Sequence, residues 1–172
     1  MRDPNTHSAS PWQDWPIDRE VVISRVINAP RSTVYSAWTD PEQIVKWFGP
    51  EGMVIESKAI DIRPGGTWRF DMVAPDGTRY TNRMVFLSLE APSRIEVEHG
   101  SDEDNDPRKF RMLVTFDEQA NGKTVLTLRQ CHPTKEIRDN AIGFGAVEYG
   151  GQTLHKLALH VSSSAMPLIK SC

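Results

Sequence analysis

Glu148 and His155, near the C-terminus, are of the residue types that exchange protons in general acid–base catalysis. They lie seven residues apart within the stretch 143–161, nearly two turns of a helix, so a bound ligand or a water molecule would have to bridge them. Bridged in this way, the pair could act as base and acid on a polyketide or an enol. The alternative is a carboxylate in solvent and a histidine whose hydrogen bonds are satisfied within the protein. Both residues are therefore weak catalytic candidates.

Predicted strands carry further polar groups that could orient a ligand. Tyr80, Asn82 and Met84 alternate along one strand and so share a face, which places Asn82 inward. His99 lies near the end of the predicted strand 93–99, on its apolar face, and is a third weak catalytic candidate.

Patterns for metal binding and nucleophilic catalysis are poorly supported. His155 and His160 are five residues apart and do not share a helix face. The acidic loop 101–107 has aspartates at alternate positions like a calcium loop, but Pro107 stands where that loop requires glycine, so we expect a solvated hairpin loop. Cys131 and its neighbour His132 should point to opposite faces of a strand, which disfavours an activated thiolate. We predict no metal ion and no cofactor.

The stretch that carries Glu148 and His155 must position them, and its periodicity predicts an amphipathic helix over 143–161, with Thr134 placed to cap the long C-terminal helix. Its apolar stripe consists of Phe144, Val147, Leu154, Ala158 and Val161. Gly143, Gly150 and Gly151 project on or beside this stripe, although each glycine inside a helix costs about 1 kcal/mol relative to alanine. Either a strand packs unusually close to these glycines, or a hollow separates the helix from its partner.

The preceding residues predict the partner, which is a curved sheet. Two short helices, 31–39 and 41–48, follow the first strand, and Asp40 is expected to cap the second of them. Alternating apolar residues separated by turn signals predict seven antiparallel strands. Their ranges are 19–28, 53–61, 67–74, 79–90, 93–99, 108–117 and 123–131. The outer face should carry charged residues that belong in water: Arg69, Asp71, Glu96, Glu98, Arg111 and Arg129.

Length and composition fit one domain. The chain has 172 residues, 38% of them hydrophobic, and a net charge of −3, which argues against a nucleic-acid partner. It contains no apolar run long enough to insert into a membrane, and its two cysteines favour a reduced, cytoplasmic protein. We expect a proline-rich N-terminal arm over 1–16, which Trp12 and Trp15 could pin to the body, a domain over 17–165 and a tail over 166–172.

Several motifs in order give the sequence a family resemblance. Ala37-Trp38-Thr39-Asp40-Pro41, Gly49-Pro50, Pro64-Gly65-Gly66, Trp68, Pro75-Asp76-Gly77 and Tyr80 resemble the SRPBCC, or START-like, superfamily. The similar branch is the one named for the activator of the ninety-kilodalton heat-shock protein ATPase, in its short bacterial form, and the resemblance covers roughly 20–161. Two positions depart from the pattern: Phe48, where a second tryptophan often stands, and Met84, where a small residue is usual.

The resemblance implies an α+β helix-grip fold, in which the curved seven-stranded sheet wraps around the long C-terminal helix and leaves a deep apolar cavity. We expect the cavity to be lined by Trp68, Phe70, Tyr80, Asn82, Met84, Val114, Phe116, Phe144, Val147 and Gly151. Fold alone does not choose the function.

Three functions are compatible with this fold. The first is non-catalytic binding of a small apolar, aromatic or lipid-like molecule by a carrier, sensor or sequestering protein. The second is an enzyme of the polyketide cyclase or dehydratase type that uses the same cavity. The third is a chaperone partner, although residues 1–16 hold neither the additional domain nor the asparagine- and tryptophan-rich motif of the chaperone activators. A homodimer is possible.

Overall fold

The turn signals between residues 53 and 131 each join two neighbouring antiparallel strands in the computed structural model, which describes residues 15–164. Gly65, Gly77 and Gly122 adopt φ values of 80°, 87° and 76°, which glycine reaches without steric cost. The seven strands form one antiparallel sheet, as predicted, and their order in it is β1-β7-β6-β5-β4-β3-β2. They are β1 (Glu20–Ile27), β2 (Val54–Ile60), β3 (Thr67–Val73), β4 (Arg79–Glu90), β5 (Arg94–Gly100), β6 (Phe110–Glu118) and β7 (Thr124–Cys131).

Two short helices follow β1, and each has a proline at or directly before its first residue. A single 3₁₀ turn (Ile17–Arg19) precedes β1. Helix α1 (Arg31–Thr39) follows Pro30, and α2 (Pro41–Trp47) begins where the Asp40 side chain accepts a hydrogen bond from the Glu42 backbone amide at 2.9 Å. The predicted cap at Asp40 is therefore confirmed.

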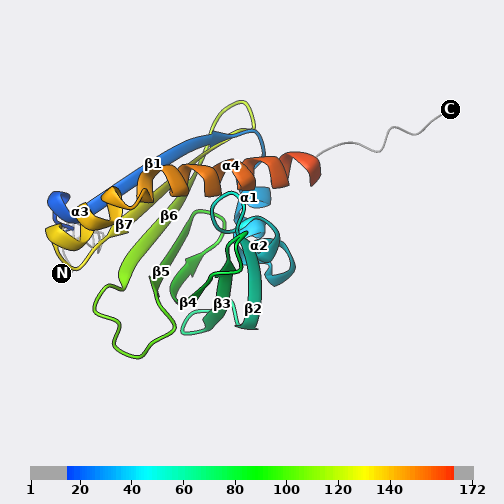
Figure 1. Cartoon of the computed structure of the whole chain (residues 1–172). Coiled ribbons are helices and arrows are strands. Elements are labelled where there is room, and N and C mark those ends of the chain that lie inside the picture. Colours follow the sequence, from blue (N-terminus) through cyan, green and yellow to red (C-terminus); the bar gives the residue numbers. More distant parts are fainter. Residues whose placement is uncertain (1–14, 165–172) are drawn as a thin grey trace, which may run out of the picture.

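The C-terminal segment folds as two helices, α3 (Lys135–Gly143) and α4 (Ala146–Ser164), and the prediction of one continuous helix is wrong. Thr134 caps α3, since its hydroxyl accepts from the Ile137 amide at 3.1 Å. The helix is interrupted at Gly145, because the φ of 96° at this residue is incompatible with a right-handed helix. α4 lies across the concave face of the sheet, with α1 and α2 at one end of it and α3 at the other (Figure 1).

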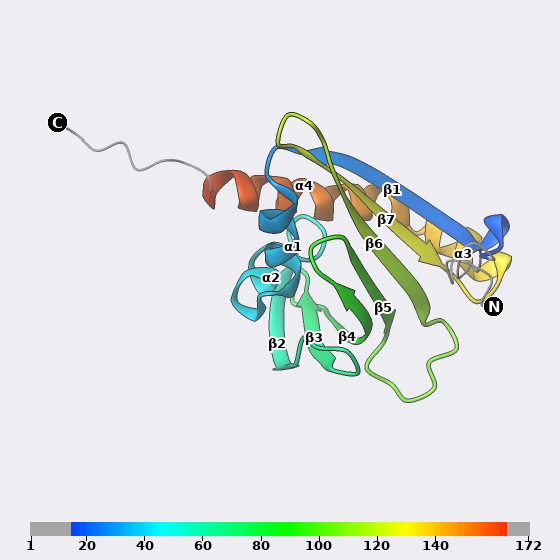
Figure 2. The same ribbon diagram turned by 180° about the vertical axis from the view of Figure 1, so that it is seen from behind.

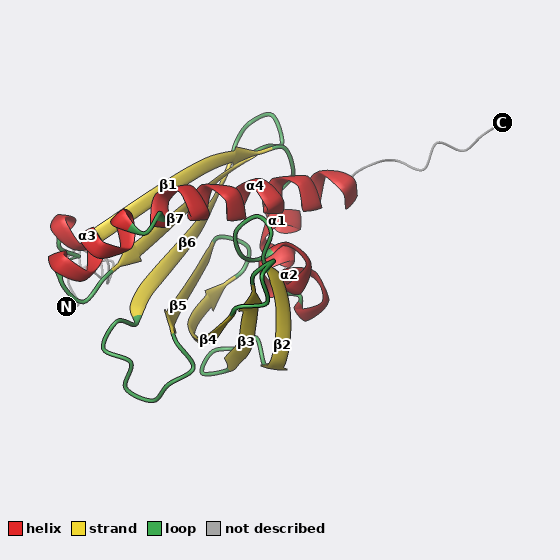
Figure 3. Ribbon diagram, viewed as in Figure 1, coloured by secondary structure: helices red, strands yellow, loops and turns green. Residues whose placement is uncertain are grey.

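Figure 3 shows the concave face of the sheet and the helices that cover it. The core consists of buried apolar side chains from both. Strand alternation directs Trp68, Phe70, Val97, Val114 and Phe116 into this core, where each is at most 1% exposed. On the described part of α4, the buried apolar residues are Leu154, Leu157 and Val161. The predicted stripe is wrong at its N-terminal end, because Phe144 falls in the break between the helices and is 83% exposed, and Val147 is 50% exposed.

The face of the sheet away from α4 is turned toward the viewer in Figure 2. Strand alternation places on it the charged residues predicted for it, although two of them are not in water. Asp71 and Glu96 are buried. Lys58 Nζ lies 2.6 Å from Asp71, Arg79 also contacts this carboxylate, and Arg111 pairs with Glu96. Alternation alone does not reveal this burial, because it accompanies ion pairs with basic partners on neighbouring strands.

The acidic loop 101–107 also departs from the expected solvated hairpin. Arg69 and Arg83 both donate to Asp102, whose side chain is 8% exposed. The buried Asp106 accepts from the backbone amides of Ser101 and Arg108. The carboxylate oxygens of Asp102 and Asp106, which a metal ion would need as ligands, therefore already accept hydrogen bonds within the protein.

Trp15 is the only residue of the expected N-terminal arm, apart from Pro16, that the structure describes. Its ring lies 5.6 Å from the guanidinium carbon of Arg129 on β7, a cation–π contact. Trp12 lies outside the described residues. No helix among residues 15–164 is both long and apolar enough to cross a membrane.

Candidate ligand-binding cavity

Two adjoining pockets open between the sheet and the C-terminal helices, at the end of the molecule where α3 meets α4. The larger has a volume of about 450 Å³ and lies between β4, β5, the 101–108 loop and α3. The smaller, of about 210 Å³, lies between the 48–50 loop, the inner strands and the first turns of α4. Both contain His99, Phe110, His132 and Ala141, so these residues form a wall common to the two pockets.

Three rings form a row on this common wall. The ring centroids of His99 and Phe110 are 5.2 Å apart, and those of Phe110 and His132 are 4.9 Å apart. The register explains the first contact, because His99 on β5 pairs directly with Phe110 on β6. His132 directly follows β7, the neighbour of β6. The row therefore runs across three adjacent strands.

His99 is held in one tautomer by a chain of hydrogen bonds. The side-chain amide nitrogen of Asn82 donates to the Tyr80 carbonyl at 2.8 Å, so its oxygen faces His99 Nε2 at 3.0 Å. That oxygen only accepts, so Nε2 carries the proton and Nδ1 presents a lone pair. Burial among aromatic rings lowers the pKa of His99 from 6.5 to about 4, because the charged imidazolium is poorly solvated there.

His132 is the second neutral histidine on the wall. Its residue exposure is 5%, and burial, with a smaller contribution from the charge of Arg138, lowers its pKa. Nε2 lies 3.3 Å from the Gln130 side-chain oxygen, whereas Nδ1 is buried without a hydrogen-bond partner among the described residues. A buried polar atom left unpaired is costly, which marks Nδ1 as a position that a ligand or water can satisfy.

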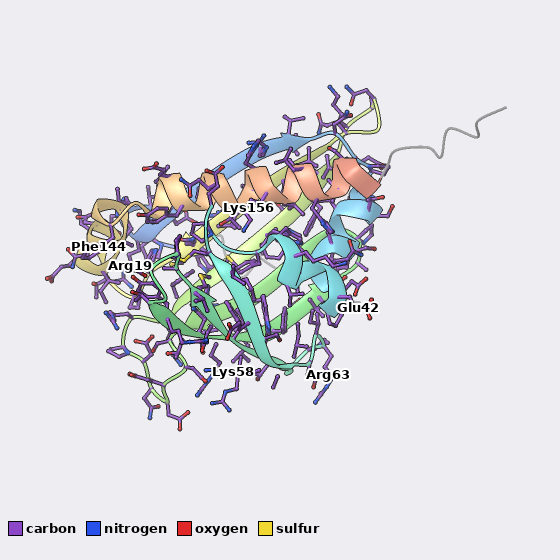
Figure 4. All side chains as sticks on the ribbon, turned by 45° about the vertical axis from the view of Figure 1, so that its right-hand side comes forward. Arg19, Glu42, Lys58, Arg63, Phe144 and Lys156 are labelled. Atoms are coloured by element: carbon purple, nitrogen blue, oxygen red, sulfur yellow. The ribbon has the colours of Figure 1, made fainter. Side chains whose placement is uncertain are left out.

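The loop after α2 lines one side of the smaller pocket and is hydrogen-bonded to α4. Lys156 Nζ donates to the carbonyls of Gly49 and Pro50 at 3.2 and 3.4 Å, and burial lowers its pKa. The Glu51 amide donates to the Gln152 side chain at 3.2 Å. Figure 4 labels Lys156 on α4 and Phe144 beyond the N-terminal end of that helix, and Phe144 lines the larger pocket. α4 thus holds one wall of the cavity in place through polar contacts.

The structure brings only part of the predicted lining to the cavity. Tyr80, Asn82 and Phe144 line the larger pocket, with Tyr80 and Phe144 exposed at its mouth, and His99 reaches both pockets. The other predicted lining residues do not contribute: Trp68, Phe70, Met84, Val114 and Phe116 lie in the solid core, Val147 is exposed, and Gly151 lines neither pocket.

The glycines of α4 illustrate the reason for this outcome. A Cβ placed on Gly150 would lie 2.2 Å from Ile23 Cδ1 of β1, whereas one placed on Gly151 would meet nothing within 4 Å. Of the two predicted alternatives, close packing against a strand therefore holds at Gly150. The cavity lies beside this contact and not behind Gly151.

Glu148 and His155 do not form a catalytic pair in the cavity. Glu148 is exposed and lines neither pocket. His155 Nδ1 accepts a hydrogen bond from Arg25 Nη2 at 3.1 Å, which joins α4 to β1 and satisfies the histidine within the protein.

The other chemical possibilities are not supported. Across the described residues, no cluster of three His, Cys, Asp or Glu side chains could hold a metal ion. Burial raises the pKa of Cys131, which opposes formation of a thiolate.

His132 was not predicted as a cavity residue. Strand alternation places it on the face opposite Cys131, and the prediction about it concerned only the activation of that thiol. Phe110 could have been predicted as a cavity residue, because strand alternation places it on the concave face and it pairs with His99.

A curved antiparallel sheet that grips a C-terminal helix and leaves an apolar cavity between them defines a helix-grip protein of the SRPBCC type. The family described as "Activator of Hsp90 ATPase homolog 1-like protein" matches residues 28–162, so the chain belongs to this family. The comparison with curated proteins gave no match.

Solved structures agree with the fold. A protein from Nitrosomonas europaea has a TM-score of 0.78 at 23% identity, with 87% of this chain and 97% of that chain covered. A protein from Chromobacterium violaceum has a TM-score of 0.68 at 26% identity, with 81% and 95% covered. The AHSA1 protein from Silicibacter pomeroyi has a TM-score of 0.69 at 18% identity, with 84% and 99% covered.

Proposed function

We propose that this protein binds a small apolar or aromatic molecule, including one of lipid-like character, in the cavity along the His99–Phe110–His132 wall, without catalysing a reaction. The observation that carries the proposal is the cavity itself, in which mostly apolar walls surround a few polar atoms. This combination is typical of small-molecule sites. A carrier, a sensor and a sequestering protein would all use it in the same way.

The electrostatics of the cavity favour binding over proton transfer. A histidine whose pKa has fallen from 6.5 to about 4 is a weaker base by two to three orders of magnitude. Glu148 and His155, the other candidate catalytic residues, lie away from the pockets. A polyketide cyclase or dehydratase is the alternative proposal, and of the histidines it would depend on His99 and His132, which line both pockets.

The family description refers to a chaperone ATPase activator, and that activity belongs to the proteins for which the family is named. We do not extend it to this chain, because the cavity supports small-molecule binding and carries no information about a chaperone. The free thiol of Cys131 fits a protein that works in the reducing cytoplasm, which is part of the proposal.

Native mass spectrometry of protein purified gently from its host tests the proposal. We expect a reproducible small-molecule adduct that is lost in Ala141→Phe, because Ala141 lines both pockets. Gly151→Leu is the matched control, since it adds a side chain where nothing lies within 4 Å and should keep the adduct. Circular dichroism confirms that both variants fold. Loss of the adduct in the control but not in Ala141→Phe would refute this location.

A further inference from the structure

Each histidine nitrogen on the common wall of the cavity either donates or accepts a hydrogen bond, and this role restricts the ligand groups that it can bind. His99 Nδ1 is an acceptor, because Asn82 fixes the proton on Nε2. A hydrogen-bond donor on the ligand would satisfy this lone pair, whereas an ether, a ketone or a carboxylate would leave it unpaired or repel it.

His132 is the second histidine of the row, with Phe110 between it and His99. Nδ1 of this 5%-exposed residue has no hydrogen-bond partner in the described part of the chain. With Nε2 donating to Gln130, Nδ1 is also an acceptor; with the amide of Gln130 reversed, it is a donor. A hydroxyl group serves either tautomer, because it both donates and accepts.

Charged ligand groups find little compensation at this wall. Phe110 lies between the two neutral histidines, and no Lys, Arg, Asp or Glu among the described residues lines the smaller pocket. In the larger pocket Asp106 and Arg108 are neighbours, with Arg108 Nε 3.9 Å from the carboxylate and its side chain 75% exposed. A buried carboxylate would therefore lose its hydration without gaining a buried cation.

We propose that the ligand carries a neutral hydroxyl group, phenolic or alcoholic, which it presents to His99 Nδ1 or to His132 Nδ1, while its apolar body fills the adjoining pockets. The site thus selects uncharged hydroxylated aromatic or alicyclic molecules over the corresponding acids. This inference rests on the proposed function, since it names the ligand class of the same cavity.

Three probes of similar size test the inference: 2-naphthol, 2-methoxynaphthalene and 2-naphthoate, each titrated calorimetrically into the full chain at pH 7. We expect 2-naphthol to bind about tenfold more tightly than 2-methoxynaphthalene, because the latter has no hydroxyl proton to donate to His99 Nδ1. 2-Naphthoate should bind more weakly still. His99→Phe keeps a ring in the row and should abolish the preference for 2-naphthol, whereas His155→Phe, outside the cavity, should preserve it.

A second measurement does not depend on a variant. In ¹⁵N NMR spectra, the Nδ1 resonance of His99 should move when 2-naphthol binds and should stay in place with 2-methoxynaphthalene. Equal affinity for these two probes, or tightest binding of 2-naphthoate, would overturn the hydroxyl inference while leaving the binding cavity intact. Failure of all three probes to bind would overturn the proposed function as well.

Discussion

Gly150 and Gly151 are neighbours on α4 with opposite surroundings, so the same substitution at each should have opposite effects on stability. Alanine in place of glycine inside a helix gains about 1 kcal/mol from propensity. At Gly151 nothing lies within 4 Å of the new methyl group, and we expect Gly151→Ala to raise the free energy of unfolding by that amount.

At Gly150 the new methyl group would lie 2.2 Å from Ile23 Cδ1, so the Ile23 side chain must move. Displacing a packed side chain costs about 1–3 kcal/mol, which cancels or exceeds the gain in propensity. Gly150→Ala should therefore be neutral or destabilise the protein by up to about 2 kcal/mol. The expected difference between the two variants is about 1–3 kcal/mol.

Urea denaturation followed by circular dichroism measures both values. The double variant Ile23→Val with Gly150→Ala supplies a matched test, because valine lacks Cδ1 and the remaining contact, at 3.7 Å, is ordinary packing. The double-mutant cycle should show a favourable coupling of at least about 1 kcal/mol. Equal stabilisation by Gly150→Ala and Gly151→Ala, with no coupling to Ile23, would refute the close packing of α4 against β1.

Three further predictions concern other parts of the fold. The folded-state pKa of His99, about 4, lies below its ordinary value of 6.5, so its neutral form contributes stability above pH 6.5 that is lost as the pH falls toward 4. His99→Phe should flatten this decline, by about 3 kcal/mol at most, in urea titrations between pH 7 and 4. Lys156→Met should increase amide hydrogen exchange at 49–53, since it removes the donor to the Gly49 and Pro50 carbonyls; unchanged exchange would contradict this role. Asp40→Ala should lower the free energy of unfolding by about 1 kcal/mol through loss of the α2 cap, whereas Asp40→Asn, another good cap, should cost less.

The strands were predictable because their signals are local. Glycines such as Gly65, Gly77 and Gly122 require a turn wherever the chain goes afterwards, and alternation then fixes the faces. The break at Gly145 was not predictable in the same way. Its cost as a helical residue is only about 1 kcal/mol, so tertiary packing decides whether the helix continues.

The position of the cavity could not be read from alternation, because core and cavity residues share the same face. α1 and α2 decide between them by filling one end of the concave face. The ring centroid of Phe48 lies 5.4 Å from that of Trp68 and 5.8 Å from that of Phe70. The ring centroids of Tyr35 and Phe116 are 5.3 Å apart. Trp68, Phe70 and Phe116, which were predicted to line the cavity, are thus covered by these aromatic side chains, and the space remains at the other end.

The break between α3 and α4 has a consequence for evolution. α3 is nine residues long, contains no buried residue, and lines the larger pocket with Ile137, Asn140 and Ala141. Because Gly145 separates it from α4, substitutions on α3 change the shape and polarity of the cavity without disturbing the buried residues that hold α4 to the sheet. Selection for a new ligand can therefore act on one short segment while the rest of the fold stays constant.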